Sequence, residues 1–223
     1  MKAPYPFVNI HTHHPSISFH EIINCDIVEN VPNDDKKLYS IGIHPWNASY
    51  LSWKKWQSVV ENYASHPSVL AIGETGIDIL RGTSRTEQQD IFLEHIRIAD
   101  SCNKPLIIHC VRAFNEIIEC KKKSKSKVPW IIHGFSSRQT IADELLAHGC
   151  FLSFGAAILY NRQHLEKICK TVPENMFFIE NDDSALPISL IYEKIADIRS
   201  VSVEYLQLKL YEQCHRIFLD KNV

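Results

Sequence analysis

Histidines and carboxylates recur in this sequence at one kind of position, the end of a short apolar run. A titratable group beside an apolar run is costly unless it is paired or binds a metal. Imidazole together with carboxylate suits zinc, manganese or iron, and two such ions can share a bridging carboxylate. One strand-end histidine is more often structural, but a coincidence of all six is improbable, and we expect a metal centre. The six residues are His11, His13, Glu74, His109, His133 and Asp182.

The first motif, His11-Thr12-His13, closes the first apolar run. Side chains two residues apart on a strand point to the same face. We therefore expect both imidazoles to converge on one point.

Short apolar runs alternate with helical patterns along the whole chain, which is typical of parallel β/α construction. Several runs are apolar throughout, as strands buried on both faces should be. The predicted strands lie near Phe7–His11, Ile22–Ile27, Leu38–Ile43, Val69–Glu74, Pro105–His109, Val128–His133, Cys150–Phe154 and Met176–Asp182.

Helices are predicted after Thr86, from Ser137 to Gly149, and over residues 187–199 and 202–219. Eight strands with intervening helices predict an α/β fold, a single compact TIM-like (β/α)8 barrel over residues 1–223. Such a barrel carries catalytic groups, and here the metal site, at the C-terminal ends of its strands. The first two connections look too short for full helices, and an open doubly wound sheet is the alternative.

Composition narrows the classes of protein. The chain has 45% hydrophobic and 22% charged residues and a net charge of −2, so any nucleic acid must be held locally rather than by a global basic field. Its seven cysteines form no CxxC pair, which favours a reducing compartment. With neither a signal peptide nor a membrane span in the pattern, we expect a cytoplasmic protein with no membrane contact and no obligate protein partner.

Six segments, in order, resemble the motifs of the TatD-related metal-dependent deoxyribonucleases, which belong to the amidohydrolase-like superfamily. The resemblance runs from Asn9 to the Arg216-Ile217-Phe218 segment. Each motif alone is weak, but the ordered set is specific. The segments are His11-Thr12-His13, Gly42-Ile43-His44-Pro45, Gly73-Glu74-Thr75-Gly76-Ile77-Asp78, Ile107-Ile108-His109, Ile132-His133-Gly134-Phe135 and Glu180-Asn181-Asp182.

The resemblance implies roles for these residues. The six histidines and carboxylates match the family's ligands for one or two divalent ions, of which Zn, Mg, Mn and Fe are not distinguished. Glu74 would bridge two ions, Asp182 would bind metal and take the proton of the attacking water, and His44 would contact the scissile phosphate. The implied activity is hydrolysis of nucleic-acid phosphodiesters, with single-stranded DNA as substrate and exonuclease character.

The sequence departs from the family pattern at four places. Asn9 stands where the D-x-H-x-H motif has Asp, and Asp183-Ser184 replaces the end of E-T-D-x-P. The arginine after His109 arrives one residue late, at Arg112. The early loops are also short. These changes leave the ligands intact but bear on the substrate.

Several residues follow strands on the predicted catalytic side. His44 precedes a proline, which restricts its backbone, and an imidazolium there would stabilise developing charge; the alternative is a structural loop histidine. Arginine suits bidentate phosphate contacts, although loops are commonly polar. Trp46 is the one candidate for base stacking, whereas Trp53 and Trp56 fit a helix packed on the core. The arginines are Arg81, Arg85, Arg112, Arg138 and Arg162.

The lysine run at residues 121–127 precedes the sixth strand, at the opposite end of the barrel, and fits a solvated helix end.

Three other functions stay open. The same ligands suit a hydrolase of a small-molecule ester, amide or phosphate, or a barrel that binds metal without catalysis. The polymerase-associated histidinol-phosphatase family also opens with an H-x-H motif.

Overall fold

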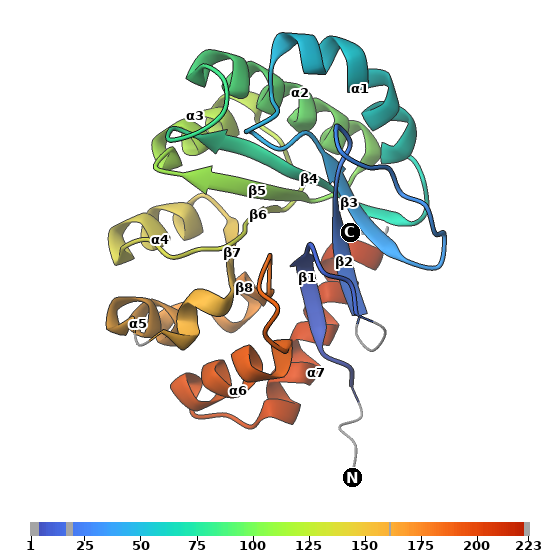
Figure 1. Ribbon diagram of the computed structural model, residues 1–223. Coiled ribbons are helices and arrows are strands. Elements are labelled where there is room, and N and C mark those ends of the chain that lie inside the picture. The colour runs from blue at the N-terminus through green and yellow to red at the C-terminus, as the bar shows by residue number, and fades with distance from the viewer. Residues whose placement is uncertain (1–4, 17–19, 161, 221–223) are drawn as a thin grey trace. The chain divides into compact units, whose positions relative to one another are not determined.

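Parallel strands form the centre of the fold. The computed structural model describes residues 5–16, 20–160 and 162–220 (Figure 1). Each predicted apolar run overlaps one strand, and the strands follow one another in chain order in one hydrogen-bonded sheet. They are β1 (Val8–Thr12), β2 (His20–Asp26), β3 (Leu38–Gly42), β4 (Val69–Asp78), β5 (Leu106–Val111), β6 (Trp130–Ile132), β7 (Cys150–Phe154) and β8 (Phe177–Ile179).

The chain beyond β8 returns to the first strand. The backbone N–H of Asp182 donates to His11 O at 3.1 Å, and the N–H of His13 donates to Asp182 O at 3.0 Å. A parallel bridge also joins Thr12 to Asp182. A sheet that closes on its own first strand has no free edge, which is what defines a barrel. The fold is therefore the predicted (β/α)8 barrel and not an open doubly wound sheet.

Strand β4 shows why the sequence folds this way. All ten of its residues are buried, as expected for a parallel strand covered on both faces. The strand continues four residues beyond its predicted end at Glu74, because Ile77 and Asp78 pair with β5. Asp78 thereby becomes a buried carboxylate near the end of the strand.

Helices follow β3 and each later strand. Helix α2 begins at Arg85 and not after Thr86 as predicted, because Ser84 and not Thr86 caps it: the Ser84 hydroxyl accepts from the N–H of Glu87 at 3.2 Å. The α-helices are α1 (Tyr50–Ala64), α2 (Arg85–Cys102), α3 (Phe114–Ser124), α4 (Gln139–Ala147), α5 (Gln163–Thr171), α6 (Ile188–Arg199) and α7 (Val203–Cys214).

The two early connections hold no helix among their described residues, 13–16 and 27–37, as predicted from their length. The last predicted helix, over residues 202–219, divides into α7 and a π-helical turn at His215–Leu219. In the part of the chain that the structure describes, no helix is both long and apolar enough to cross a membrane.

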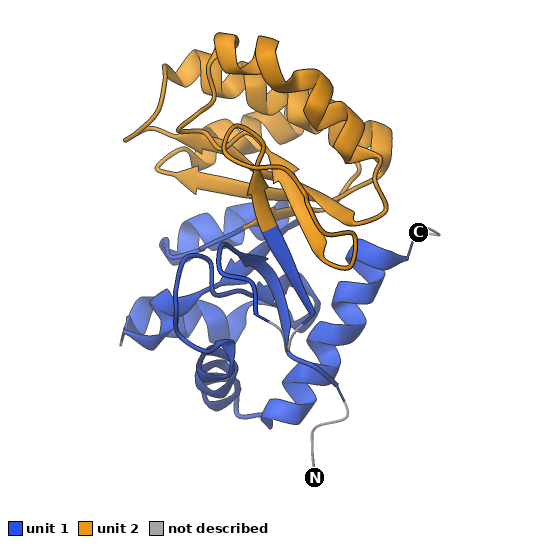
Figure 2. Ribbon diagram, turned by 45° about the vertical axis from the view of Figure 1, so that its right-hand side comes forward, with its two compact units in different colours: residues 1–23, 133–223 blue, residues 24–132 orange. Residues whose placement is uncertain are grey.

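The chain divides into two compact units (Figure 2). Unit 1 comprises residues 1–23 and 133–223; α4 packs on β7, α7 packs on β1, and α5 and α6 contact their neighbouring helices. Tyr192 of α6 anchors β1 there: its hydroxyl donates to Val8 O at 2.9 Å and accepts from Val8 N at 3.0 Å. Burial raises the pKa of Tyr192, so the phenol stays neutral and can make both bonds.

Unit 2 comprises residues 24–132, with helices α1 to α3 packed with β3 to β6. Its core includes Phe92 and Trp130, whose rings meet edge to face with centroids 5.4 Å apart. The expectation of one domain over residues 1–223 stays a prediction.

Candidate metal centre

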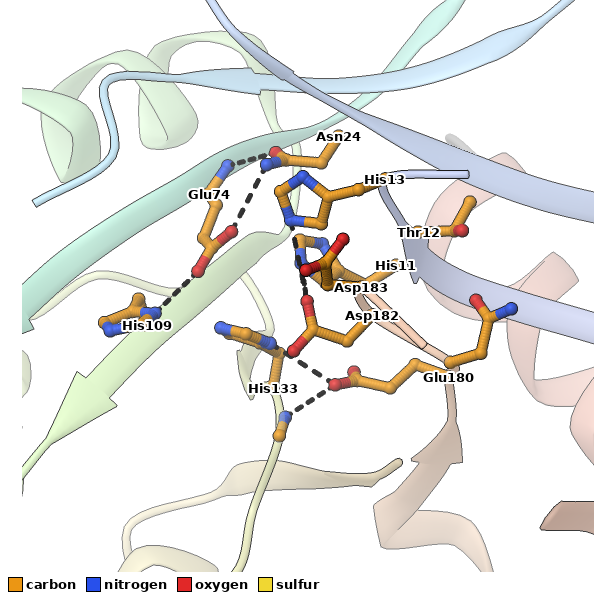
Figure 3. A network of polar contacts seen from close by, with 12 residues as sticks. His11, Thr12, His13, Asn24, Glu74, His109, His133, Glu180, Asp182 and Asp183 are labelled. Carbon is orange, nitrogen blue, oxygen red and sulfur yellow. Dashed lines mark hydrogen bonds and ion pairs between the residues drawn. The ribbon is translucent and has the colours of Figure 1, made fainter. Parts of the chain in front are cut away.

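In unit 1, two histidines and an aspartate come together where β1 ends (Figure 3). His11 Nε2 lies 3.4 Å from Asp182 Oδ1, and His13 Nε2 lies 3.5 Å from the same oxygen. The side chain of His11 is fully buried, whereas those of His13 and Asp182 are 38% and 41% exposed. The alternation along β1 thus brings both imidazoles to one carboxylate, as the sequence predicted.

Asp182 is held in an uncommon backbone conformation. Its φ of +53° lies in the left-handed region, which aspartate and asparagine tolerate better than most residues. The two backbone hydrogen bonds to β1 hold it there. Strained conformations of this kind persist where the surrounding structure determines them, often at functional sites.

His133 is held by a carboxylate that sequence reasoning did not assign. Glu180, at the end of β8, is fully buried, and its Oε1 accepts from the N–H of Gly134 at 2.6 Å. The Nδ1 of His133 lies 3.3 Å from the same oxygen. A proton on Nδ1 would make this a hydrogen bond and leave Nε2 as the ligand atom, the usual arrangement behind a metal-binding histidine. The signal was present in the sequence: Glu180 lies two residues before Asp182.

The family departure at Asn9 is matched by a second amide. Asn9 Nδ2 donates to Asn181 Oδ1 at 2.8 Å, and Asn9 Oδ1 accepts from the N–H of Asn181 at 3.3 Å. A neutral pair therefore joins β1 to the segment after β8, two residues before His11 and one residue before Asp182. Asp183 lies outside this pair and contacts His14, with Nε2 and Oδ1 2.8 Å apart on exposed side chains.

The unit 1 cluster fits a divalent cation. Two atoms that each bond one ion at about 2.1 Å with a tetrahedral angle lie about 3.4 Å apart. The separations of 3.4 and 3.5 Å from Asp182 to the two imidazoles have this value. His133 and Glu180 form an overlapping group with Asp182 in which the ligand atoms lie within 4.8 Å of one another. The donor set, imidazole and carboxylate, is that of a zinc, manganese or iron site.

In unit 2, Glu74 gathers three polar side chains around a carboxylate that is 2% exposed. Its Oε1 lies 2.6 Å from His109 Nδ1 and 3.2 Å from His44 Nε2. Asn24 brackets the residue, because its Oδ1 accepts from the N–H of Glu74 at 2.9 Å and its Nδ2 donates to Oε2 at 3.2 Å. Partners of this kind are what make a buried carboxylate tolerable.

A second carboxylate, Asp78, stands on the other side of His109, with 3.5 Å between Oδ2 and Nε2. Burial alone would raise the pKa of Asp78. Hydrogen bonds from Trp46 and from the N–H of Leu80, with the charge of His109, outweigh it and lower the pKa. His109 thus lies between two carboxylates.

His44 is placed by a buried histidine, His95, nearly three helical turns into α2. His95 Nε2 accepts from the N–H of Ile43 at 3.0 Å, and its Nδ1 donates to Ile91 O at 2.8 Å. Burial lowers the pKa of His95 to about 4, so the ring is neutral near pH 7 and can both donate and accept. His95 is structural, as expected from its place on a helix, and it fixes the backbone that carries His44.

The arginines differ in what they contact. Arg81 lies over the Trp46 ring, with its guanidinium carbon 4.6 Å from the centroid, and Arg85 forms an ion pair with Glu116. Arg112 is exposed with a φ of +56° directly after β5. Arg138 and Arg162 are exposed at the starts of α4 and α5.

The lysine run lies at a helix end, and two of the tryptophans differ in exposure. Lys121, Lys122 and Lys123 occupy the last turn of α3. Trp53 lies half-buried on α1 against the His95 ring, with centroids 5.1 Å apart. Trp46 is 45% exposed.

Comparison with known proteins agrees with this geometry. Residues 16–219 match the family model described as TatD related DNase. An uncharacterized metal-dependent hydrolase of Buchnera aphidicola is 30% identical over 206 residues, which cover 89% of this chain and 77% of that protein. The 3'-5' ssDNA/RNA exonuclease TatD of Escherichia coli is 29% identical over 149 residues, 63% of this chain and 55% of that protein.

Solved structures show the same fold. The crystal structure of YjjV, a TatD homologue from Escherichia coli, superposes with a TM-score of 0.78 at 17% identity and covers 95% of this chain and 97% of that one. The family model covers most of the chain, and the clusters of both units carry metal-binding side chains at strand ends. This chain therefore belongs to the TatD-related DNase family and is a metal-dependent hydrolase.

Proposed function

We propose that the protein hydrolyses phosphodiester bonds of nucleic acid, with single-stranded DNA as substrate and exonuclease character. The observation that carries the proposal is the pair of imidazole–carboxylate clusters at the ends of β1, β8, β4 and β5. Membership of the family, and the name of the Escherichia coli relative, support nucleic acid as the substrate class.

We further propose that the six predicted residues are the metal ligands and that Glu74 is the carboxylate suited to bridging two ions. Four of them (His11, His13, His133 and Asp182) belong to unit 1, and Glu74 and His109 belong to unit 2. In a (β/α)8 barrel the catalytic groups lie towards the carboxyl ends of the strands, and each of the six residues lies near such an end, which supports their assignment as ligands. A bound divalent cation supplies Lewis acidity, which polarises a phosphoryl group and makes water a better nucleophile near neutral pH.

The protein's own groups divide the remaining work. The exposed carboxylate of Asp182 accepts the proton of the attacking water. His44, positioned through Ile43 and His95, stabilises charge on the phosphate oxygens. Arginines supply further contacts to the backbone phosphates. We propose Arg81 first, because Arg85 is paired with Glu116, and Arg112 and Arg138 after it.

The test combines metal analysis with a substrate panel. Protein purified without chelators should contain about one or two divalent ions per chain and should cleave labelled single-stranded DNA. Chelation should abolish cleavage, and each metal added back singly should identify the active one. Metal-loaded protein that cleaves neither DNA nor RNA would overturn the nuclease assignment.

A hydrolase of a small-molecule ester or phosphate is the second candidate. The exposed pair of His14 and Asp183 favours it, because a carboxylate beside the ligand Asp182 repels a polyanion. A salt titration separates the two functions. Nucleic-acid affinity falls steeply as salt rises, whereas the KM for a small neutral ester would barely change.

A further inference from the structure

Exposed apolar side chains gather on two loops of unit 2, beside His44. Trp46 is 45% exposed, Ile79 44% and Leu80 59%. Resting on the proposed nuclease function, we propose that Trp46 and Arg81 form a nucleobase-binding subsite, on which a base of single-stranded nucleic acid stacks.

The Trp46 ring is exposed but fixed. Its Nε1 donates to Asp78 Oδ2 at 2.7 Å, and Asp78 is only 3% exposed. The other oxygen of Asp78 accepts from the N–H of Leu80 at 2.8 Å. One buried carboxylate thus holds both the Trp46 ring and the loop that follows β4 in place. An exposed ring held by a buried group is arranged for a ligand, because fixing it in advance reduces the entropy lost on binding.

The loop that carries Arg81 is equally constrained. The buried side chain of Gln88 donates through Nε2 to Asp78 O, Arg81 O and Thr83 O, at 3.1, 2.9 and 3.0 Å. Gly82 has a φ of +88°, and a Cβ there would lie 2.5 Å from Pro45 O. Only glycine allows this loop to press against the turn that contains Trp46.

Arg81 completes the surface. Its guanidinium carbon lies 4.6 Å from the Trp46 ring centroid, and among the described residues no acidic side chain pairs with it. Arg85, by contrast, is engaged by Glu116. A guanidinium plane and an indole are both platforms on which bases stack, and the guanidinium charge also attracts the adjacent phosphate.

The position of the subsite indicates the substrate class. The rings of Trp46 and His44 have centroids 4.7 Å apart, in an edge-to-face arrangement. A nucleotide joins an aromatic base to a phosphate through one sugar, so it can place the base on Trp46 while its phosphate lies at His44. A simple phosphate ester leaves the ring without a partner. The inference therefore favours a base-bearing nucleic acid over a small ester.

The experiment measures binding of a short fluorescein-labelled single strand by anisotropy, in the Asp182→Asn background, which prevents cleavage during the measurement. Trp46→Ala should weaken binding about 5- to 150-fold, the range for loss of one stacked base. Trp46→Phe should retain most of the affinity. Arg81→Ala should lower the slope of log affinity against log salt by about 0.7, the loss of one phosphate contact. An abasic strand of equal length should bind Trp46→Ala and its parent alike.

The chain offers a matched control on α1, where Lys55 Nζ lies 4.6 Å from the Trp56 ring centroid. Trp56→Phe and Lys55→Ala should leave binding unchanged. The subsite would be overturned if substitutions at Trp46 and Trp56 weakened binding equally. It would also be overturned if Trp46→Ala weakened binding of the abasic strand as much as binding of the normal strand. Failure of the Asp182→Asn protein itself to bind any oligonucleotide would overturn it as well. In that case, metal-dependent hydrolysis of bis(p-nitrophenyl) phosphate by wild-type protein would show that the hydrolase function stands without the subsite.

Discussion

In unit 2 the Glu74 carboxylate is 2% exposed, and its neighbours lie 2.6 to 3.2 Å away. In unit 1 the Asp182 side chain is 41% exposed, and its two imidazole neighbours lie at 3.4 and 3.5 Å. The first carboxylate is held by hydrogen bonds to protein groups, whereas the second has the spacing of ligands around a cation.

This difference assigns different tasks to two acidic residues of similar chemistry. Glu74 is fixed by Asn24 and His109, so it can hold position and charge but has little freedom to exchange a proton with solvent. Asp182 is more accessible, and two backbone hydrogen bonds to β1 hold its position. Unit 1 should therefore supply the proton acceptor, whereas unit 2 should supply a fixed carboxylate ligand and, through His44, a contact for the phosphate.

The largest expected effect comes from Asp182→Asn. Asparagine also tolerates a φ of +53°, so the fold should persist while the proton acceptor is lost. We expect kcat to fall about 10²- to 10⁴-fold, the usual contribution of a general base. Thermal unfolding should change little. An unfolding temperature like that of the wild type with nearly full kcat would contradict the division of tasks between the units.

The second effect is a loss of folding stability in unit 2 at acid pH, caused by His95. The pKa of its ring is about 4 in the folded protein, against an ordinary value of about 6.5. The unfolded chain therefore binds more protons in this interval, so stability is fully present above about pH 6.5 and falls as the pH drops towards 4. The loss should be on the order of 3 kcal/mol.

Denaturant unfolding at about pH 7 and pH 4 measures this loss. His95→Gln keeps a polar group on α2 but does not titrate, so its stability should depend less on pH over the same interval. Asp26 acts in the opposite sense, because burial raises its pKa and a raised carboxyl pKa adds stability as the pH falls. Identical pH profiles for the variant and the wild type would rule out His95 as the cause.

A third, smaller effect belongs to unit 1. Glu180→Gln keeps an oxygen for the N–H of Gly134 but removes the charge beside His133. Metal affinity should fall about 10- to 100-fold, as is usual when a residue that orients a ligand is changed. Competition with a chromogenic chelator measures it. Glu166→Gln, which removes a carboxylate paired with Lys194 in the same unit, should leave the affinity unchanged.

The sequence was sufficient to predict the positions of the strands and the polar residues that lie near their ends. The apolar run at Pro105–His109 predicts a buried parallel strand, observed as β5, and period-two geometry places His11 and His13 on one face. The family motifs added order to these positions. What was predicted well depends on local pattern and chain order.

Contacts between distant segments were not predictable in the same way. The bracketing of Glu74 by Asn24 spans 50 residues, and nothing in the sequence near either residue indicates it. The role of Glu180 was not predictable, because the sequence does not distinguish a buried glutamate from an exposed one. Only its burial and its hydrogen bond with Gly134 reveal the difference. The role of His95 likewise depends on which backbone N–H it meets.

The smallest effect tests whether the departure at Asn9 is compensated. Asn9→Asp would set a carboxylate oxygen against Asn181 Oδ1, which now lies 2.8 Å from the Asn9 amide nitrogen, so the donor is lost and two acceptors face each other. We expect a loss of about 1 kcal/mol in unfolding free energy. Adding Asn181→Thr, which restores the family's pattern of Asp and Thr, supplies a hydroxyl donor and should recover most of it. A double-mutant cycle measures the coupling, which should be about 0.5 kcal/mol or more in favour of the double variant. Additive losses would mean that Asn9 and Asn181 contribute independently, and that their neutral pair is not the reason this chain tolerates an amide where the family motif has Asp.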